Sequence, residues 1–200
     1  MNEASFQTRV DRPLVGDVDL EACLRAIPAE FMVKGMFFTR YVNALEGTWE
    51  KMASSLDAPG RHGRYHAFES YPMRDYMRLF DRVARERFPG STREAYRLMS
   101  RGEIEVFSES TLGKVAFSLV GDPGAALLRY PDLLAAVTRG PSVAAHKRDA
   151  KHVHMFFDRV FGTPEQVMGL VEGLVLMFEE TPILEATVSD AEKMTLDVRW

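Results

Sequence analysis

The chain has 200 residues, a formal net charge of −4 and a pI of about 5.8. This length is typical of one domain, and the weak acidic charge gives no general attraction to nucleic acid or to an anionic membrane. Met1–Phe6 lacks the apolar core of a signal peptide, and no apolar run approaches the ~20 residues of a membrane span. The single cysteine, Cys23, excludes an internal disulfide framework, so we expect a buried thiol and a cytoplasmic location.

Residues 1–16 show no hydrophobic period and contain Pro13 and Gly16, which predicts a flexible leader before a single domain of residues 17–200. The domain is expected to be helical over residues 17–140. Its first helix is predicted from Val18 to Ile27, with Asp17 as N-cap and Pro28 as the stop.

Four further helices are expected in this part of the chain. Aromatic and apolar residues recur at helical spacing from Phe37 to Leu45, and a stronger amphipathic pattern begins at Pro72, with Asp75 and Asp81 on its polar face. Ser91 and Glu94 have the spacing of a capping box at the start of the next helix. Asp122 and Pro123 begin a helical stretch that reaches Thr138.

Residues 141–200 carry the clearest pattern. Strands flanking residues 148–150 predict a β-hairpin, and a helix follows that is capped by Thr163 and Gln166. Glu165, Glu172 and Glu179, spaced seven apart, are expected on its solvated edge. Two strands end the chain, and the final row of Met194, Leu196, Val198 and Trp200 alternates as in a sheet buried on one side. The predicted fold class is therefore α+β, a helical bundle followed by a ββαββ unit with a four-stranded antiparallel sheet.

A ligand pocket is expected between this sheet and the preceding helices. Two glycines lie one helical turn apart in the last helix, where each costs about 1 kcal/mol relative to alanine. Their lack of a side chain allows a strand, a partner helix or a ligand to approach closely. Aromatic residues at helical spacing favour either a solid core or a pocket wall. The candidate pocket residues are Phe37, Tyr41, Tyr71, Tyr76, Phe80, Gly169 and Gly173.

No pattern of residues predicts catalysis. His146, His152 and His154 lie on the hairpin, but the surrounding Lys147 and Arg148 disfavour a bound cation, and no metal site is predicted. A basic cluster from Arg61 to His66 is expected to be an exposed loop. Neither a phosphate-binding glycine loop nor a nucleophile elbow is present in the sequence.

Several segments resemble a family of uncharacterised proteins of similar length that occurs in many copies in myxobacteria. The matching segments are Val33–Phe37, Ser70–Pro72, Arg93–Met99, Gly169–Gly173 and Val198–Trp200. The resemblance covers roughly residues 30–200 and carries no established activity.

The order of elements is also similar to the superfamily of heme nitric-oxide-binding (H-NOX) domains, four-vinyl-reductase domains and TRAPP vesicle-tethering subunits. This resemblance implies a ligand-binding or signalling module. H-NOX domains have an iron-ligating histidine in the helix before the hairpin, and residues 124–138 contain none. Their tyrosine–serine–arginine clamp for the heme propionates would fall at residues 156–160, which do not match it. The acylated cysteine of TRAPP subunits has no counterpart, because Cys23 lies outside the matched region.

We therefore expect a non-enzymatic module that binds a small apolar ligand and acts in regulation or signalling. A bound cofactor is not expected, and heme or another tetrapyrrole lacks its ligand histidine. Two alternatives stay open: a dimeric protein–protein interaction module that uses a homodimer or another protein partner, and a heme-based gas sensor. Neither nucleic acid nor a membrane span is expected as part of its function.

Overall fold

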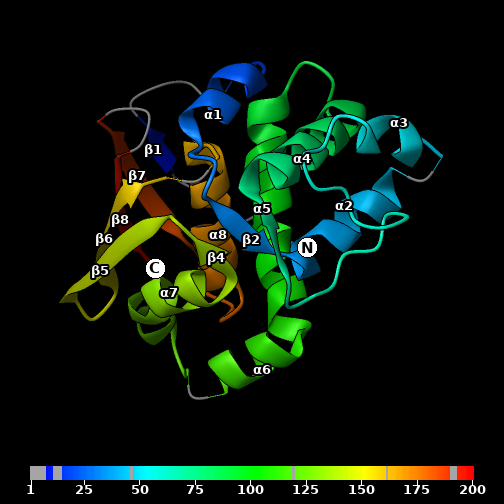
Figure 1. Ribbon diagram of the computed structural model, residues 1–200. Coiled ribbons are helices and arrows are strands. Elements are labelled where there is room, and N and C mark those ends of the chain that lie inside the picture. The colour runs from blue at the N-terminus through cyan, green and yellow to red at the C-terminus, as the bar shows by residue number, and fades with distance from the viewer. Residues whose placement is uncertain (1–7, 11–14, 46, 119, 161, 190–192) are drawn as a thin grey trace.

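The computed structural model describes residues 8–10, 15–45, 47–118, 120–160, 162–189 and 193–200. Helices fill the first two-thirds of the chain, and a large sheet lies at the C-terminal end (Figure 1). Both parts share a core of buried residues that runs from Val18 to Val198. The expected α+β class, with helices followed by ββαββ, is confirmed.

The helices of the first two-thirds are mostly placed as the sequence indicates. They are α1 (Leu20–Ala26), the 3-10 turn η1 (Gly35–Phe37), α2 (Phe38–Ala44), α3 (Trp49–Ala53), α4 (Met73–Arg87), α5 (Thr92–Glu109), α6 (Thr111–Phe117) and α7 (Pro123–Val137). Two capping predictions were wrong. Asp19 caps α1, whereas Asp17 accepts a hydrogen bond from the Thr92 backbone N–H. Ser91 is the N-cap residue of α5, but its side chain makes no capping hydrogen bond.

The large sheet has five strands in the order β1–β7–β8–β6–β5. Strands β5 (Ser142–Asp149), β6 (His152–Arg159), β7 (Ile183–Val188) and β8 (Met194–Arg199) are antiparallel to their neighbours, as expected for the ββαββ unit. Strand β1 (Thr8–Val10) adds a fifth strand parallel to β7, so this part of the expected leader is ordered in the sheet. The other leader residues to position 14 and the turn at 190–192 lie outside the described residues.

The inner face of the sheet forms one side of the core. Met194, Leu196 and Val198 are fully buried, and Trp200 packs against the same cluster. Helix α8 (Pro164–Leu176), with the predicted capping box of Thr163 and Gln166, separates this face from α5 (Figure 1). The alternating row of the final strand is therefore turned inward as the period of two indicates.

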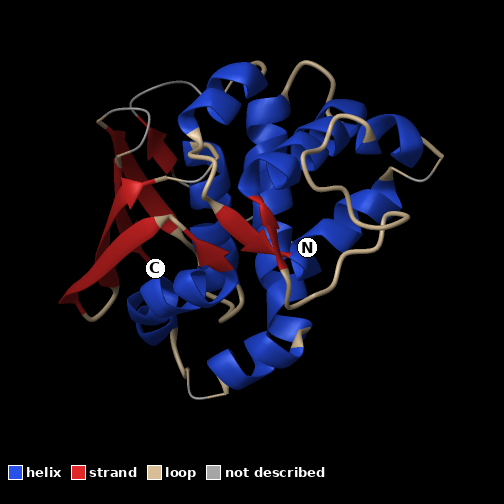
Figure 2. Ribbon diagram, viewed as in Figure 1, coloured by secondary structure: helices blue, strands red, loops and turns tan. Residues whose placement is uncertain are grey.

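A second, smaller sheet was not expected from the sequence. It joins β3 (Ser70–Pro72), β2 (Met32–Lys34) and β4 (Thr138–Arg139) in that order and lies among the helices, apart from the large sheet (Figure 2). Strands of two or three residues are too short to show a period of two. By pairing Val33 with Tyr71 and with Thr138, this sheet brings three distant segments to one side of the core.

None of the described helices combines the length and the apolar character needed to cross a membrane.

Cys23 lies on α1 as the small buried residue that the sequence predicts. Burial raises the pKa of its thiol to about 12, and the charges of Asp81 and Glu165 add to the effect. Only the thiolate reacts readily with alkylating reagents. We expect the native protein to remain unlabelled by iodoacetamide near pH 8, whereas protein unfolded in urea takes up one label per chain. Mass spectrometry distinguishes the two states, and stoichiometric labelling of the native protein would show that Cys23 is accessible.

Candidate functional site

A small cavity lies where helices α4, α5, α7 and α8 meet beside β2. The cavity has a volume of about 60 Å³. Its walls are overwhelmingly apolar, and they include Met73, Ile104, Phe107, Leu134, Leu170 and Leu174. For comparison, an engineered apolar cavity of about 150 Å³ binds benzene. The volume therefore suits a molecule smaller than benzene.

Glu103 of α5 is the charged residue in this wall. The residue is only 5% exposed. Its carboxylate Oε1 accepts hydrogen bonds from the hydroxyls of Tyr41 and Tyr76, the latter at 2.5 Å. A buried carboxylate needs hydrogen-bond donors to offset its lost hydration, and here the two tyrosines supply them to one oxygen.

The electrostatics of this group are set by burial. Burial raises the pKa of Glu103, while the hydrogen bonds from Tyr41 and Tyr76 and the charge of Arg40 act in the opposite direction. Burial also raises the pKa of both tyrosines well above the usual value, so their hydroxyls stay protonated and serve as donors.

Tyr130 of α7 adds a second polar group to the same cavity. The residue is buried, and its hydroxyl has no hydrogen-bond partner among the described residues. Burial, together with the nearby charge of Glu103, raises its pKa. Buried hydroxyls normally form hydrogen bonds. The Tyr130 hydroxyl is therefore an exception among the described residues.

The expected pocket residues separate into three places. Phe37 and Tyr76 line the cavity. Tyr41 lies behind the wall, bonded to Glu103, and Phe80 packs against Tyr41 with ring centroids 5.2 Å apart. Tyr71 is not part of the cavity wall; it packs against Phe38 and Tyr65, and its hydroxyl donates to Glu69. The structure thus places two of these five aromatic residues in the cavity wall.

Gly169 and Gly173 lie where α8 contacts α5. A Cβ on Gly169 would be 2.1 Å from the Arg97 carbonyl oxygen, and one on Gly173 would be 2.5 Å from the Arg101 carbonyl oxygen. Both are too close for real contacts, so the two glycines are explained by the approach of a helix. Their neighbours Leu170 and Leu174 carry the side chains that reach the cavity.

Ion pairs flank this glycine contact, and they correct the expectation of a solvated edge. Glu165 and Glu172 are buried on α8. Glu165 pairs with Arg93 at 2.5 Å, and Glu172 pairs with both Arg97 and Arg101 of α5. Asp75 and Asp81, expected to face water on α4, are likewise buried and bonded.

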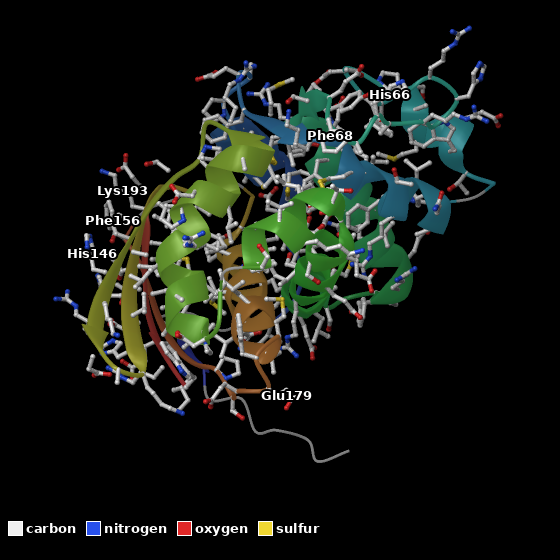
Figure 3. The ribbon with its side chains drawn as sticks, turned by 90° about the horizontal axis from the view of Figure 1, so that it is seen from below. His66, Phe68, His146, Phe156, Glu179 and Lys193 are labelled. Atoms are coloured by element: carbon white, nitrogen blue, oxygen red, sulfur yellow. The ribbon has the colours of Figure 1, made fainter. Side chains whose placement is uncertain are left out.

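The histidines of the hairpin lie on the outer face of the large sheet, where His146 points away from the helices (Figure 3). His152 and His154 both hydrogen bond to Asp197 Oδ1, at 2.7 and 3.1 Å. Burial alone would raise the pKa of Asp197, but the bonds from the two histidines lower it. No group of three potential metal ligands is found in the described part of the chain. These side chains lie on the face of the sheet opposite to the cavity.

Sequence reasoning missed Glu103 and Tyr130. A signal for Glu103 was present, because Met99, Glu103 and Phe107 are spaced by four and share one face of α5. A carboxylate within such an apolar stripe is buried, and a buried carboxylate is an informative exception. Tyr130 had no comparable signal, since buried tyrosines are common.

The fold is similar to that of several solved structures. The structure resembles an Fe(II) unliganded H-NOX protein from K. algicida, with a TM-score of 0.63 and 14% identity over 83% of this chain and 95% of that chain. It also resembles a mutant structure of T. tengcongensis H-NOX, with a TM-score of 0.61 and 18% identity over 83% and 96% of the two chains. An oxygen-binding H-NOX domain related to soluble guanylate cyclases gives a TM-score of 0.60 and 20% identity, with 83% and 93% covered. The chain therefore has an H-NOX-like fold.

Residues 26–200 match the model of the family described as "Protein of unknown function (DUF2378)", and the chain belongs to that family. A search of curated proteins found no sequence match.

The residues of this chain do not fit a heme. A cavity of about 60 Å³ is smaller than the ~150 Å³ that holds benzene, and a porphyrin is several times larger than benzene. The lining contains no histidine to ligate iron and no arginine or lysine to neutralise propionates. The helix before the hairpin, α7, presents Tyr130, Leu133, Leu134 and Val137 to the cavity instead.

Proposed function

We propose that the protein is a non-enzymatic small-molecule-binding module of a regulatory or signalling kind, and that it works without heme. The observation that carries this proposal is the apolar cavity with Glu103 and the unpartnered Tyr130 hydroxyl in its wall. Apolar cavities with a few convergent polar groups are the usual form of a ligand site. The related fold serves as a ligand site in the oxygen-binding H-NOX domain, which supports the same use here by analogy of fold.

Xenon binding tests the cavity itself. The chain has three isoleucines, of which Ile104 lines the cavity and Ile183 is exposed on the large sheet. With ¹³C-labelled isoleucine methyl groups, we expect xenon to shift the Ile104 signal in a saturable way and to leave Ile183 unchanged. The variant Leu134→Phe, which adds volume to the wall, should weaken the response. If xenon does not change the chemical shift of the Ile104 methyl group, the proposal is overturned.

We expect no heme binding. The purified protein, titrated with hemin under reducing conditions, should show only the absorbance of free heme, without a sharp Soret band that grows to one equivalent. The physical reasons are the small cavity and the absence of a histidine in its lining. A stoichiometric Soret band would restore the gas-sensor alternative. The expected cytoplasmic location stays a prediction. The dimeric interaction module stays an alternative, and light scattering over a range of concentrations tests it.

A further inference from the structure

Glu103 and Tyr130 are two of the residues with polar groups in the cavity wall, and they differ in the hydrogen bonds that they can still form. Glu103 Oε1 accepts from the hydroxyls of Tyr41 and Tyr76, and the two oxygens of a carboxylate have about four acceptor sites, so Glu103 can accept further hydrogen bonds. Tyr130 carries a hydroxyl with no partner among those residues. Glu103 is on α5 and Tyr130 is on α7, and both line the same cavity. Glu103 is therefore an acceptor with capacity for another donor, and the Tyr130 hydroxyl lacks a hydrogen bond within the described residues.

The remaining wall limits the size and polarity of an occupant. One water-sized group needs a cavity volume of about 10–15 Å³. A cavity of about 60 Å³ therefore holds a molecule of roughly four to six heavy atoms. Phe37, Ile104 and Leu134 surround it with apolar surface, which favours a hydrocarbon body over a chain of polar groups.

A single hydroxyl group meets both polar needs at once. It donates to Glu103 and accepts from Tyr130, because a hydroxyl is both donor and acceptor. A carboxylate ligand would be repelled by Glu103. An ammonium group could donate to both residues, but it leaves the Tyr130 hydroxyl proton without an acceptor, and its charge loses more hydration on burial than a neutral hydroxyl does. We infer that the cavity takes a small neutral alcohol with a short apolar body and one hydroxyl directed between Glu103 and Tyr130. This inference rests on the proposed function of the same cavity.

Two isomers of equal size provide the test. 1-Butanol donates and accepts a hydrogen bond, whereas methyl propyl ether only accepts. We expect both to shift the Ile104 methyl signal, with 1-butanol binding about threefold to tenfold more tightly, as one net hydrogen bond implies. Butyrate should not bind, and butylammonium should bind more weakly than 1-butanol.

Variants assign the preference to the two residues. Glu103→Gln keeps the shape of the side chain but removes the charge, and it should reduce the preference for 1-butanol over the ether. Tyr130→Phe removes the hydroxyl and should weaken both ligands to a similar extent. Tyr65→Phe alters a buried tyrosine outside the cavity wall and serves as the matched control, with no expected change.

The outcomes separate the two proposals. If neither isomer shifts Ile104, the cavity is not a ligand site and the proposed function fails. If 1-butanol and the ether bind equally well to the unaltered protein, the cavity is still a ligand site, but the inference that its ligand is an alcohol is overturned. If butylammonium binds more tightly than 1-butanol, the inference is overturned and the ligand is a cation. The comparison in the unaltered protein needs no variant, so it holds even if Glu103→Gln does not fold.

Discussion

We expect Glu172→Gln to lower the free energy of unfolding by about 3 kcal/mol at pH 7. The carboxylate of Glu172 is 1% exposed and pairs with Arg97 and Arg101. Removing one partner of a buried ion pair leaves an uncompensated charge, at a cost of about 3–5 kcal/mol. The lower value applies here because the two arginine side chains are 14% and 23% exposed, and water can reach part of each guanidinium. Urea unfolding followed by circular dichroism measures the change as a shift of the midpoint.

Glu180→Gln is the matched control for this experiment. Glu180 pairs with Lys151 at 2.9 Å, but both side chains are exposed. Exposed ion pairs contribute about 0.2–1 kcal/mol, so the midpoint should scarcely move. Equal losses in the two variants would show that burial does not set the energy of the Glu172 pair.

The second large effect is expected at the contact between α5 and α8. Gly169→Ala places a Cβ where the Arg97 carbonyl oxygen lies, at 2.1 Å. Because that atom belongs to the backbone, the helices must separate, and overpacking of this kind costs about 1–3 kcal/mol. The gain of about 1 kcal/mol in helix propensity offsets only part of the strain. We therefore expect a net loss of stability, again measured by urea unfolding.

Gly121→Ala tests whether the loss comes from this contact. A Cβ on Gly121 meets nothing within 4 Å, and the backbone there is not in the left-handed region. Its substitution should be neutral within about 0.5 kcal/mol. A neutral result at Gly169 as well would mean that α8 can move away from α5 at little cost.

The C-terminal third was predictable because its signals are local. Thr163 and Gln166 form a capping box over four residues, and the row from Met194 to Trp200 alternates within seven. Each pattern lies within one element, where sequence spacing corresponds directly to spatial neighbourhood. The start of α8 and the buried face of the final strand followed from these patterns without knowledge of the rest of the chain.

Contacts between distant segments were not predictable in the same way. Glu165 and Glu172 have the spacing of a solvated edge, and their burial depends on arginines more than 70 positions earlier in the chain. Asp75 is buried for a similar reason, since it accepts the backbone N–H groups of Asp57 and Ala58. A charged residue on a helix is expected to be exposed to solvent only when no distant residue pairs with it. A single sequence does not reveal such a partner.

The cavity depended on both kinds of information. Phe37 and Tyr76 were expected near a pocket from helical spacing, and both line it. The polar end was missed, because Glu103 and Tyr130 come to one cavity only when α5 and α7 both pack with α8 around it. The candidate ligand chemistry is thus a property of the packed structure.

The outer strand β5 has a consequence for how this protein behaves when concentrated. It forms one border of the large sheet, while β1 covers the opposite border. Its register with β6 is interrupted at two points, and exposed Lys147 and Arg148 lie near its end. Irregular pairing and positive charge on a border strand discourage another chain from extending the sheet. These features of β5 therefore disfavour strand-by-strand aggregation through this border of the sheet.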